Sequence, residues 1–421
     1  MYRKSITKAV LFLNALFVST VVFAQTDSTE YKHFRFGGYG EILFQRMNYG
    51  ADRYKDPTGA PRENRACISI PRTIFALDYK FRDDLVLSTE VEFEYGGTGA
   101  AMELEYDEAG EYEMEVEKGG EVALEQFHIT KRFASWFNVR AGHFIVPVGL
   151  TNAHHEPIFF FGTARPESEM TILPCTWHET GLAILGTYKG LKYEIMIVTG
   201  LDPNGFSSSN WVQGGKQGMF ETDVMTSPAY AVRLEYTPVK GLRLGASGYY
   251  NKTARNASMP QKTAGIDANV TIGTFDVQYI NKNAAVRANF IYGHLTDALR
   301  LSQINRNISR ATQFPRTPVA ETAMTYAVEA GYNVFSFFGL KEKLTPFMRY
   351  EYYNSAEKVP SGMAEMPINK RSVFTFGANY ALLSNLLIKA DYSIRRLDND
   401  NFNRENTFGI AVAYTGWFVQ K

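Results

Sequence analysis

Polar and apolar residues alternate with a period of two along most of the chain. In residues 229–238, the side chains of Tyr230, Val232, Leu234 and Tyr236 share one face, opposite Arg233 and Glu235. This period is typical of a β-strand with two different faces. It recurs in residues 34–47, 85–96, 265–273, 346–353, 386–396 and 406–418.

The connections between these strands alternate in length. Seven are short: 81–84, 133–136, 188–191, 237–241, 272–275, 382–385 and the somewhat longer 337–343. Eight are long: 47–66, 97–120, 147–178, 201–227, 252–261, 295–321, 354–369 and 398–404. We therefore predict an all-β fold, a transmembrane antiparallel β-barrel of about 16 strands with short turns at one rim and long loops at the other. A large secreted sandwich or propeller is the alternative, but its loops need not alternate, and the sequence repeat of a propeller is not found.

The first residues predict export. Arg3, Lys4 and Lys8 precede an apolar run from Ala9 to Ala24, and small residues occupy positions 22 and 24. This is the pattern of a signal peptide, here residues 1–24, which leaves residues 25–421 as one barrel domain. A single transmembrane anchor is the alternative, but the run is short for a spanning helix. We expect the outer membrane of a Gram-negative bacterium, with lipid and lipopolysaccharide around the barrel.

Composition supports the barrel and excludes one class of partner. The chain has 44 basic and 44 acidic residues, and removal of the signal peptide leaves it slightly acidic, so no nucleic-acid partner is expected. Aromatic residues make up 14% of the chain, which favours strands. Mean hydropathy is nevertheless only −0.23, as expected when lipid-facing apolar residues alternate with polar residues facing a lumen.

A barrel of this size is too wide for its side chains to fill, so we expect a hydrated lumen and passive diffusion of small hydrophilic solutes. A hydrated lumen explains why Glu90, Glu92 and Glu94 share one face of a strand, because a dry core would not tolerate three acidic side chains. Acidic and basic lumen residues nearly cancel, and Arg233 with Glu235 and Arg349 with Glu351 suggest cross-strand pairs that stiffen the wall. The predicted pore-lining residues of the strands are Arg35, Arg72, Glu90, Glu92, Glu94, Arg140, Arg233, Arg243 and Arg349.

The third long loop, residues 147–178, is predicted to fold inward and narrow the channel. It begins at Pro147, which ends ladder hydrogen bonding, and Phe159, Phe160 and Phe161 are poorly suited to an outer loop in water. The loop also supplies His154, His155, Glu156 and Arg165 to the predicted constriction.

A metal site in this loop is the alternative interpretation. The adjacent side chains of His154, His155 and Glu156 diverge, and no spaced pair such as HExxH is present, although His178 and Glu179 could complete a site. No G-x-S-x-G motif occurs either. We therefore expect no metal, no other cofactor and no enzymatic activity.

The two cysteines, Cys67 and Cys175, are both expected near the loop rim in an oxidising compartment. A disulfide between them would tether the constriction loop. Two free buried thiols are the alternative.

The stretches "VRAGHFIVPVGL" (139–150) and "AVRLEYTPVKGLRLGAS" (231–247) resemble the phosphate-selective porins O and P, in the form found in Bacteroidetes. The resemblance implies a homotrimer whose lumen carries an arginine ladder and favours inorganic anions such as phosphate. The nearly equal numbers of acidic and basic residues in the lumen depart from that pattern, because preferential passage of anions needs an excess of positive potential along the channel. A barrel with a plugged lumen that serves as a structural or surface-interaction protein is the alternative function.

Overall fold

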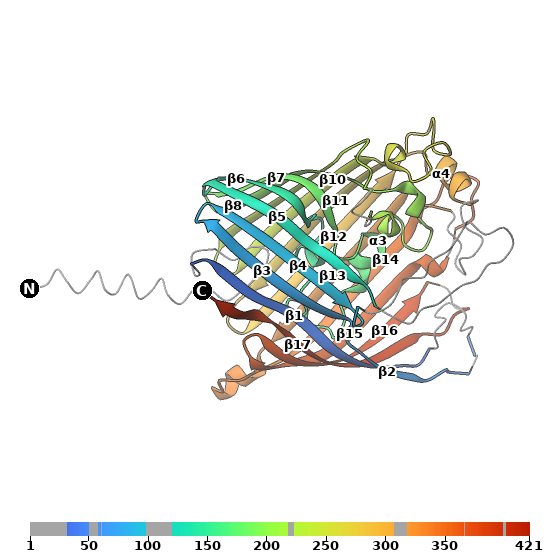
Figure 1. The fold of residues 1–421 in the computed structure, drawn as a ribbon. Coiled ribbons are helices and arrows are strands. Elements are labelled where there is room, and N and C mark those ends of the chain that lie inside the picture. The colour runs from blue at the N-terminus through green and yellow to red at the C-terminus, as the bar shows by residue number, and fades with distance from the viewer. Residues whose placement is uncertain are drawn as a thin grey trace, which may run out of the picture.

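The computed structural model describes residues 32–49, 58–59, 61–97, 120–217, 223–306, 318–365, 367–398 and 401–421, so the predicted signal peptide lies outside the described residues. Their strands form one closed antiparallel sheet (Figure 1). The strands are β1 (Phe34–Met47), β2 (Arg65–Ser69), β3 (Arg72–Arg82), β4 (Leu85–Glu94), β5 (Val122–Ala134), β6 (Phe137–Ile145), β7 (His178–Tyr188), β8 (Leu191–Val198), β9 (Ala229–Val239), β10 (Leu242–Lys252), β11 (Asn269–Ile280), β12 (Ala284–Leu295), β13 (Thr322–Tyr332), β14 (Lys343–Lys358), β15 (Lys370–Leu383), β16 (Leu386–Leu397) and β17 (Glu405–Gln420).

Helical segments lie in the connections between strands. The α-helices are α2 (Leu150–Ala153), α3 (Glu167–Ile172) and α4 (Ala298–Asn305), and the short 3-10 helices are η2 (Pro203–Gly205), η3 (Gln213–Gly215), η4 (Thr253–Asn256), η5 (Val334–Phe338) and η6 (Pro367–Asn369). Among the described residues, no helix is long and apolar enough to cross a membrane.

β2 and β3 together form a single barrel strand. β2 pairs with Leu43–Met47 of β1 and β3 pairs with Phe34–Gly40 of the same strand. Ile70 and Pro71 separate them, and proline has no N–H to give to the ladder. β1 also pairs with β17, which closes the ring. The predicted barrel of 16 strands is therefore confirmed.

Short turns gather at one rim and long connections at the other, and the carboxyl terminus lies at the turn rim (Figure 1). One predicted turn, at residues 272–275, is wrong. Gly273 lies inside β11, opposite Tyr292, and the chain turns instead at residues 281–283. There the Asn281 side chain accepts hydrogen bonds from the backbone N–H of Asn283 and of Ala284. Asparagine often stabilises a turn in this way, whereas a glycine can also lie within a regular ladder.

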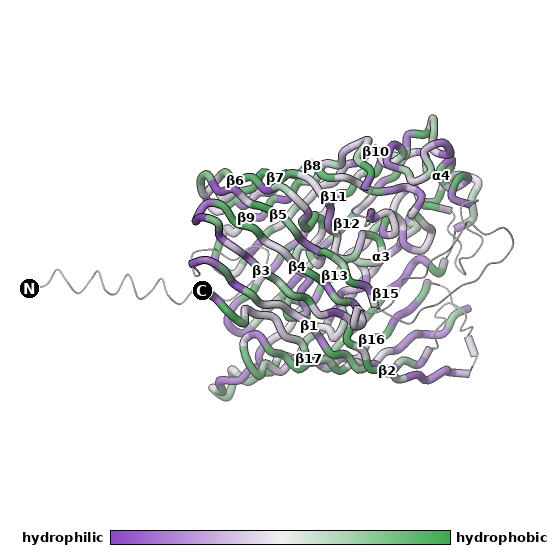
Figure 2. The backbone as a smooth tube through the Cα atoms, viewed as in Figure 1, coloured by the Kyte–Doolittle hydropathy of each residue, from purple (hydrophilic) through white to green (hydrophobic). Residues whose placement is uncertain are grey.

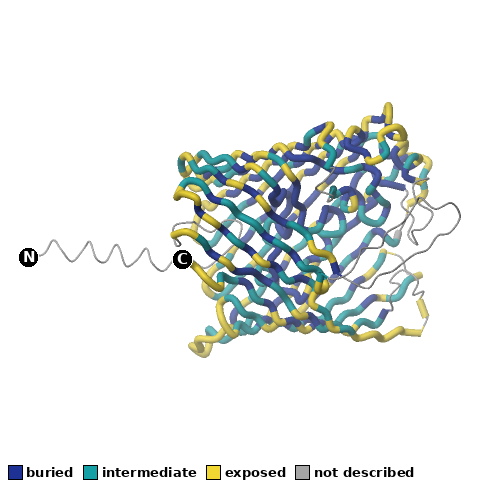
Figure 3. The backbone as a smooth tube through the Cα atoms, viewed as in Figure 1, coloured by how far each residue is buried: buried dark blue, intermediate teal, exposed yellow. Residues whose placement is uncertain are grey.

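Hydropathy and burial both vary from residue to residue along the strands of the wall (Figures 2 and 3). On β9, Tyr230, Val232 and Leu234 are exposed on the outside, whereas Arg233 and Glu235 are buried on the lumen side. An apolar outer face of this kind is what hydrocarbon chains require.

The loop-side half of the lumen is partly dry, which corrects one expectation. Val270 and Ile272 of β11, predicted to face outward, are 0% and 1% exposed and lie on the same face as Asp276. They belong to an inner apolar cluster built from loop residues and the lumen side of β6 to β14. Trp211 lies within it and donates from Nε1 to the carbonyl of Ala320 at 3.2 Å. The cluster comprises, among others, Phe144, Val148, Ile172, Trp177, Phe206, Trp211, Val270, Ile272, Ile291 and Leu301.

The lipid-facing assignment can be tested at Val412, which is 39% exposed near the middle of β17, beside the equally outward Ile42 and Ile388. Replacing Val412 with arginine should lower the free energy of unfolding in lipid vesicles by about 2–4 kcal/mol, because a charge is costly near the bilayer midplane. Urea titration measures this. Val412→Leu serves as the control and should be nearly neutral; an arginine variant as stable as the control would contradict the assignment.

Candidate functional site: the inward loop and the lumen

The connection between β6 and β7, residues 146–177, crosses the lumen; we call it the inward loop. β6 ends at Ile145, shortly before Pro147. About half-way around the barrel, Lys389 of β16 donates hydrogen bonds to the carbonyls of Pro157, Phe160 (2.8 Å) and Gly162 (3.0 Å). A loop that starts at one wall and is held at the opposite one must narrow the space between them.

The three consecutive phenylalanines pack at the far end of this loop. Phe160 and Phe161 are 4% and 8% exposed. The Phe161 ring stacks on Phe347 of β14 with ring centroids 5.3 Å apart, and Lys389 Nζ lies 4.3 Å from the Phe160 ring centre. Burial is thus found for Phe160 and Phe161, whereas Phe159 is only half-buried.

Glu169 of α3 holds the start of the loop together. Its carboxylate accepts hydrogen bonds from the backbone N–H groups of Leu150 (3.1 Å), Thr151 (3.0 Å) and Asn152 (2.7 Å), and from Asn289 Nδ2 of β12 (2.9 Å). One buried carboxylate therefore satisfies three backbone donors that have no partner in the short helix α2. Nothing in the linear sequence marked Glu169, because its partners lie far from it along the chain.

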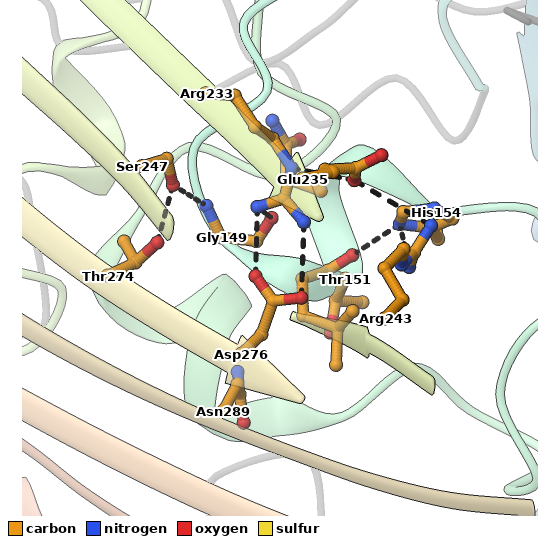
Figure 4. Close-up of polar contacts among 12 residues, drawn as sticks. Gly149, Thr151, His154, Arg233, Glu235, Arg243, Ser247, Thr274, Asp276 and Asn289 are labelled. Carbon is orange, nitrogen blue, oxygen red and sulfur yellow. Dashed lines mark hydrogen bonds and ion pairs between the residues drawn. The ribbon is translucent and has the colours of Figure 1, made fainter. Parts of the chain in front are cut away.

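Arg233 anchors the base of the loop to the wall (Figure 4). Its guanidinium donates to Glu235, to Asp276 of β11 and to the carbonyl of Gly149 (3.2 Å). Gly149 N donates in turn to Ser247 Oγ at 3.1 Å. Gly149 has a φ of 91°, and an added Cβ would lie 2.4 Å from Glu169 Oε1, so a glycine is required at this position.

His154 lies beside Arg243, which donates from Nη1 to His154 Nε2 at 2.6 Å (Figure 4). His154 Nδ1 lies 3.1 Å from the carbonyl of Leu150. Burial, reinforced by the Arg243 charge, lowers the pKa of His154 well below its ordinary value. A neutral imidazole that donates from Nδ1 and accepts at Nε2 fits both contacts.

The remaining predicted arginines of the wall form ion pairs. Arg35 contacts Asp78 and Arg140 contacts Glu194. Arg72 contacts Glu92 and, unforeseen from the sequence, Glu125.

Arg233 pairs with Glu235 and Arg349 with Glu351, but the expectation that these two pairs cross between strands is wrong. Each of these pairs forms within one strand. Each arginine also reaches a carboxylate on another strand, namely Asp276 or Glu329.

The remaining residues predicted to line the pore are three glutamates of β4 and Arg165 of the inward loop. Glu90 and Glu92 are 6% and 4% exposed on the lumen side, and Glu94 is half-buried. Arg165 donates to Thr176 Oγ1 at 2.7 Å and to Cys175 Sγ at 3.0 Å.

Cys67 and Cys175 are both free thiols in the structure, so of the two alternatives the disulfide is not formed.

His155 and Glu156 are buried in the loop. His178 and Glu179 do not join them. His178 contacts His143 and Lys216, while Glu179 accepts hydrogen bonds from Trp177 Nε1 and Gly200 N.

Two large cavities lie on either side of the inward loop. The turn-side vestibule has a volume of about 840 Å³ and is lined by residues such as Ser88, Gln126 and Asn138. The loop-side vestibule has a volume of about 600 Å³ and is lined by residues such as Thr163, Arg349 and Arg395.

Two narrow cavities of about 30 Å³ each lie between the vestibules, and a volume of this size holds roughly one water molecule. One narrow cavity shares Gln126, Arg140 and Lys192 with the turn-side vestibule, and the other shares Arg349 with the loop-side vestibule. Both are lined by His154, so the two narrow cavities adjoin at this residue.

The numbers of positive and negative side chains that line each of the two vestibules are nearly equal. The turn-side vestibule is lined by Arg35, Arg132, Arg140 and Lys192 with Asp78, Asp83, Asp84 and Glu90. The loop-side vestibule is lined by Arg65, Arg165, Arg349, Arg371 and Arg395 with Glu167, Glu351, Asp391 and Glu405.

The role of Glu169 gives a prediction for the inward loop. In Glu169→Ala, the backbone N–H groups of Leu150, Thr151 and Asn152 lose a charged acceptor worth about 1.5–3 kcal/mol. Their hydrogen exchange should accelerate roughly ten-fold or more, while the amides of β11 stay protected. Exchange followed by mass spectrometry on the folded barrel measures this, with the exposed Glu342→Gln as control. Unchanged exchange at these three amides would show that Glu169 does not hold the loop.

Comparisons with known proteins agree with this architecture. A family model described as "Putative beta-barrel porin-2, OmpL-like" matches residues 195–415. An uncharacterized protein of Aquifex aeolicus (strain VF5) is 27% identical over 366 residues, which is 85% of this chain and 74% of the relative.

Three solved structures share the fold, each with a TM-score of 0.55. They are the anion-selective porin from Comamonas acidovorans (9% identical, 91% of this chain and 99% of the other), OmpF of Salmonella typhi in complex with daunomycin (13%, 90% and 97%) and the outer membrane channel DcaP of Acinetobacter baumannii (10%, 93% and 99%). The resemblance to phosphate-selective porins is thereby supported at the level of porins in general. The family model covers more than half of the chain, so this closed barrel with its inward loop belongs to the OmpL-like beta-barrel porin-2 family, whose members are non-enzymatic outer-membrane barrels.

Proposed function

We propose that this porin is a narrow channel for passive diffusion of small hydrophilic solutes. The observation that carries the proposal is the series of two vestibules and two narrow cavities, in which neighbouring cavities share lining residues and both narrow ones adjoin His154. Paired arginines and carboxylates line this path, and such groups can replace part of the hydration shell of a small polar solute. Small side-chain movements in the inward loop would let such a solute pass.

We propose little overall charge selectivity. Neither vestibule has a large excess of one charge, and selectivity needs such an excess along the path. Phosphate and other small inorganic anions would be among the solutes, because Arg165, Arg349, Arg371 and Arg395 line the loop-side vestibule together. Arginine binds phosphate oxygens in a bidentate manner.

Export and assembly complete the proposal. Residues 1–24 would act as the signal peptide, with the mature barrel surrounded by outer-membrane lipid and lipopolysaccharide. The homotrimer implied by the resemblance to phosphate-selective porins stays a prediction.

A barrel with a plugged lumen and a structural or surface-interaction role is the second candidate. The inner apolar cluster around Trp211 and the narrowness of the two cavities beside His154 favour it.

Single-channel recording in a planar bilayer distinguishes the two candidates. For the refolded protein we expect small steps in the current that increase linearly with voltage, with a reversal potential near zero in a KCl gradient. Addition of phosphate should reduce the current carried by KCl. Complete absence of steps from a folded, heat-modifiable barrel would reject the channel and favour the plugged barrel. A reversal potential close to that of an ideal anion or cation channel would contradict weak selectivity.

The position of the path can be tested by labelling Ala164, an exposed residue of the inward loop that lines the loop-side vestibule. In a Cys67→Ser, Cys175→Ser background, Ala164→Cys modified with a bulky maleimide should lose at least half of its single-channel conductance, because the label occupies the vestibule. Lys341→Cys, exposed at the turn rim, is the labelled control and should keep its conductance. Equal conductance in both labelled variants would place the path elsewhere.

A further inference from the structure

Three side chains from different segments converge where the inward loop meets the barrel wall. Glu90 comes from β4, Glu125 from β5 and His155 from the loop, and one ligand atom of each lies within 4.8 Å of the other two. Their exposed fractions are 6%, 0% and 5%. Among the described residues, no other set of three or more histidine, cysteine or acidic side chains comes together in this way.

Glu125 reaches the lumen because β5 contains a β-bulge. Glu90 is opposite Gln126 and the next residue, Val91, is opposite Leu124, so Glu125 is an extra residue in the ladder. Glu125 and Gln126 are consecutive and yet both buried, whereas Phe127 is exposed on the lipid side. Bulges often redirect a side chain beside a functional site. This one adds a carboxylate to the lumen that regular alternation would direct into lipid.

His155 presents an unpartnered nitrogen to these carboxylates. Its Nδ1 lies 3.1 Å from the carbonyl oxygen of Asn152, a contact in which Nδ1 must carry the proton. Nε2 is buried without a hydrogen-bond partner and lies 3.9 Å from Glu125 Oε2. Nε2 therefore faces the carboxylate oxygens without a hydrogen-bond partner, and a cation bound between them would satisfy both groups.

The positive charges near this group are fewer than its carboxylates. Among the described residues, Arg72 is the one guanidinium in contact with Glu125, through Oε1, and it also pairs with Glu92. The Lys216 ammonium interacts with the same two carboxylates without an ion-pair contact. Tyr39 donates its hydroxyl to Glu125 Oε2 at 3.1 Å, which leaves that oxygen a second lone pair. Glu90 is 6% exposed beside them and adds another acidic group. The cluster holds more acidic than basic groups in a buried position, an arrangement that favours binding of a cation.

We propose that Glu90, Glu125 and His155 bind a divalent transition-metal ion such as Zn²⁺, which bridges the barrel wall and the inward loop. Two carboxylates and one imidazole form a known type of zinc ligand set, and an imidazole disfavours Mg²⁺ and Ca²⁺. Ligand atoms around tetrahedral zinc lie about 3.3 Å apart, so the side chains need to move inward by roughly 1 Å or less. The Asn152 carbonyl fixes the orientation of the imidazole, as outer-shell acceptors commonly do for metal-binding histidines.

The ion would reach the site from the lumen. Glu90 lines the turn-side vestibule and His155 lines the narrow cavity next to it. Binding would connect His155 of the inward loop to β4 and β5, two strands that form no ladder hydrogen bonds with the loop. The bound ion would therefore fix the position of the loop at the narrowest part of the proposed path.

The first experiment is a Zn²⁺ titration of the refolded full-length barrel in detergent, by calorimetry or equilibrium dialysis. We expect one zinc ion per chain, with binding weakened ten-fold or more in Glu125→Gln and in His155→Gln. His294→Gln, which removes an exposed histidine on the outer face of β12, is the matched control and should bind as the unmodified protein does. Absence of saturable binding to the unmodified barrel, or equal binding by His155→Gln, would overturn the proposal.

A second measurement identifies the ligands directly. Co²⁺ bound to His155→Cys should gain a thiolate-to-metal charge-transfer band that the unmodified protein lacks, whereas a site elsewhere would give identical spectra. His155→Cys keeps a metal-binding side chain at position 155. It therefore tests the proposed ligand set even if Glu125→Gln fails to give a heat-modifiable barrel. Both experiments are independent of conduction, because a barrel that passes no current can still bind zinc, and a conducting barrel can fail to bind it.

Discussion

The closure of sixteen strands into a ring determines the rest of the structure. Hydrogen bonding between β1 and β17 leaves no free edge, as a membrane requires, but it also fixes a diameter that wall side chains cannot fill. Loops must therefore occupy the lumen or leave it open, and this chain does both. The inner apolar cluster fills the loop-side half next to β6 to β14, and the vestibules remain on the turn side and next to β14 to β17.

Polar groups hold the inward loop, although apolar packing fills the space behind it. Lys389 and Glu169 each bind three backbone groups of the loop and Arg233 binds one, which satisfies carbonyls and N–H groups that have no strand partner. Apolar contacts are non-directional and tolerate sliding, whereas several hydrogen bonds to one charged group fix a position. A constriction with a defined width needs the second kind of contact, and the charged wall supplies it.

Alternation along the chain was enough to predict the barrel, its strand number, its lipid face and the inward loop, because each follows from local period and loop length. Tertiary contacts decided the rest. Val270 and Ile272 were assigned to lipid since an apolar residue on a strand looks the same whether a membrane or a folded loop covers it. Glu169 carried no local signal. Glu125 was missed because the bulge that turns it inward breaks the very alternation used to find lumen residues.

Neutral average charge is therefore a poor guide to what the lumen can bind. Arginines predominate slightly in the loop-side vestibule, while Glu90, Glu92 and Glu125 gather around a single guanidinium where β4 and β5 meet the loop. Fields in a hydrated lumen are screened over about 10 Å, so a solute or ion senses these local groups rather than their sum. One barrel can thus show little selectivity in the current it passes and still bind a cation tightly at one point of its wall.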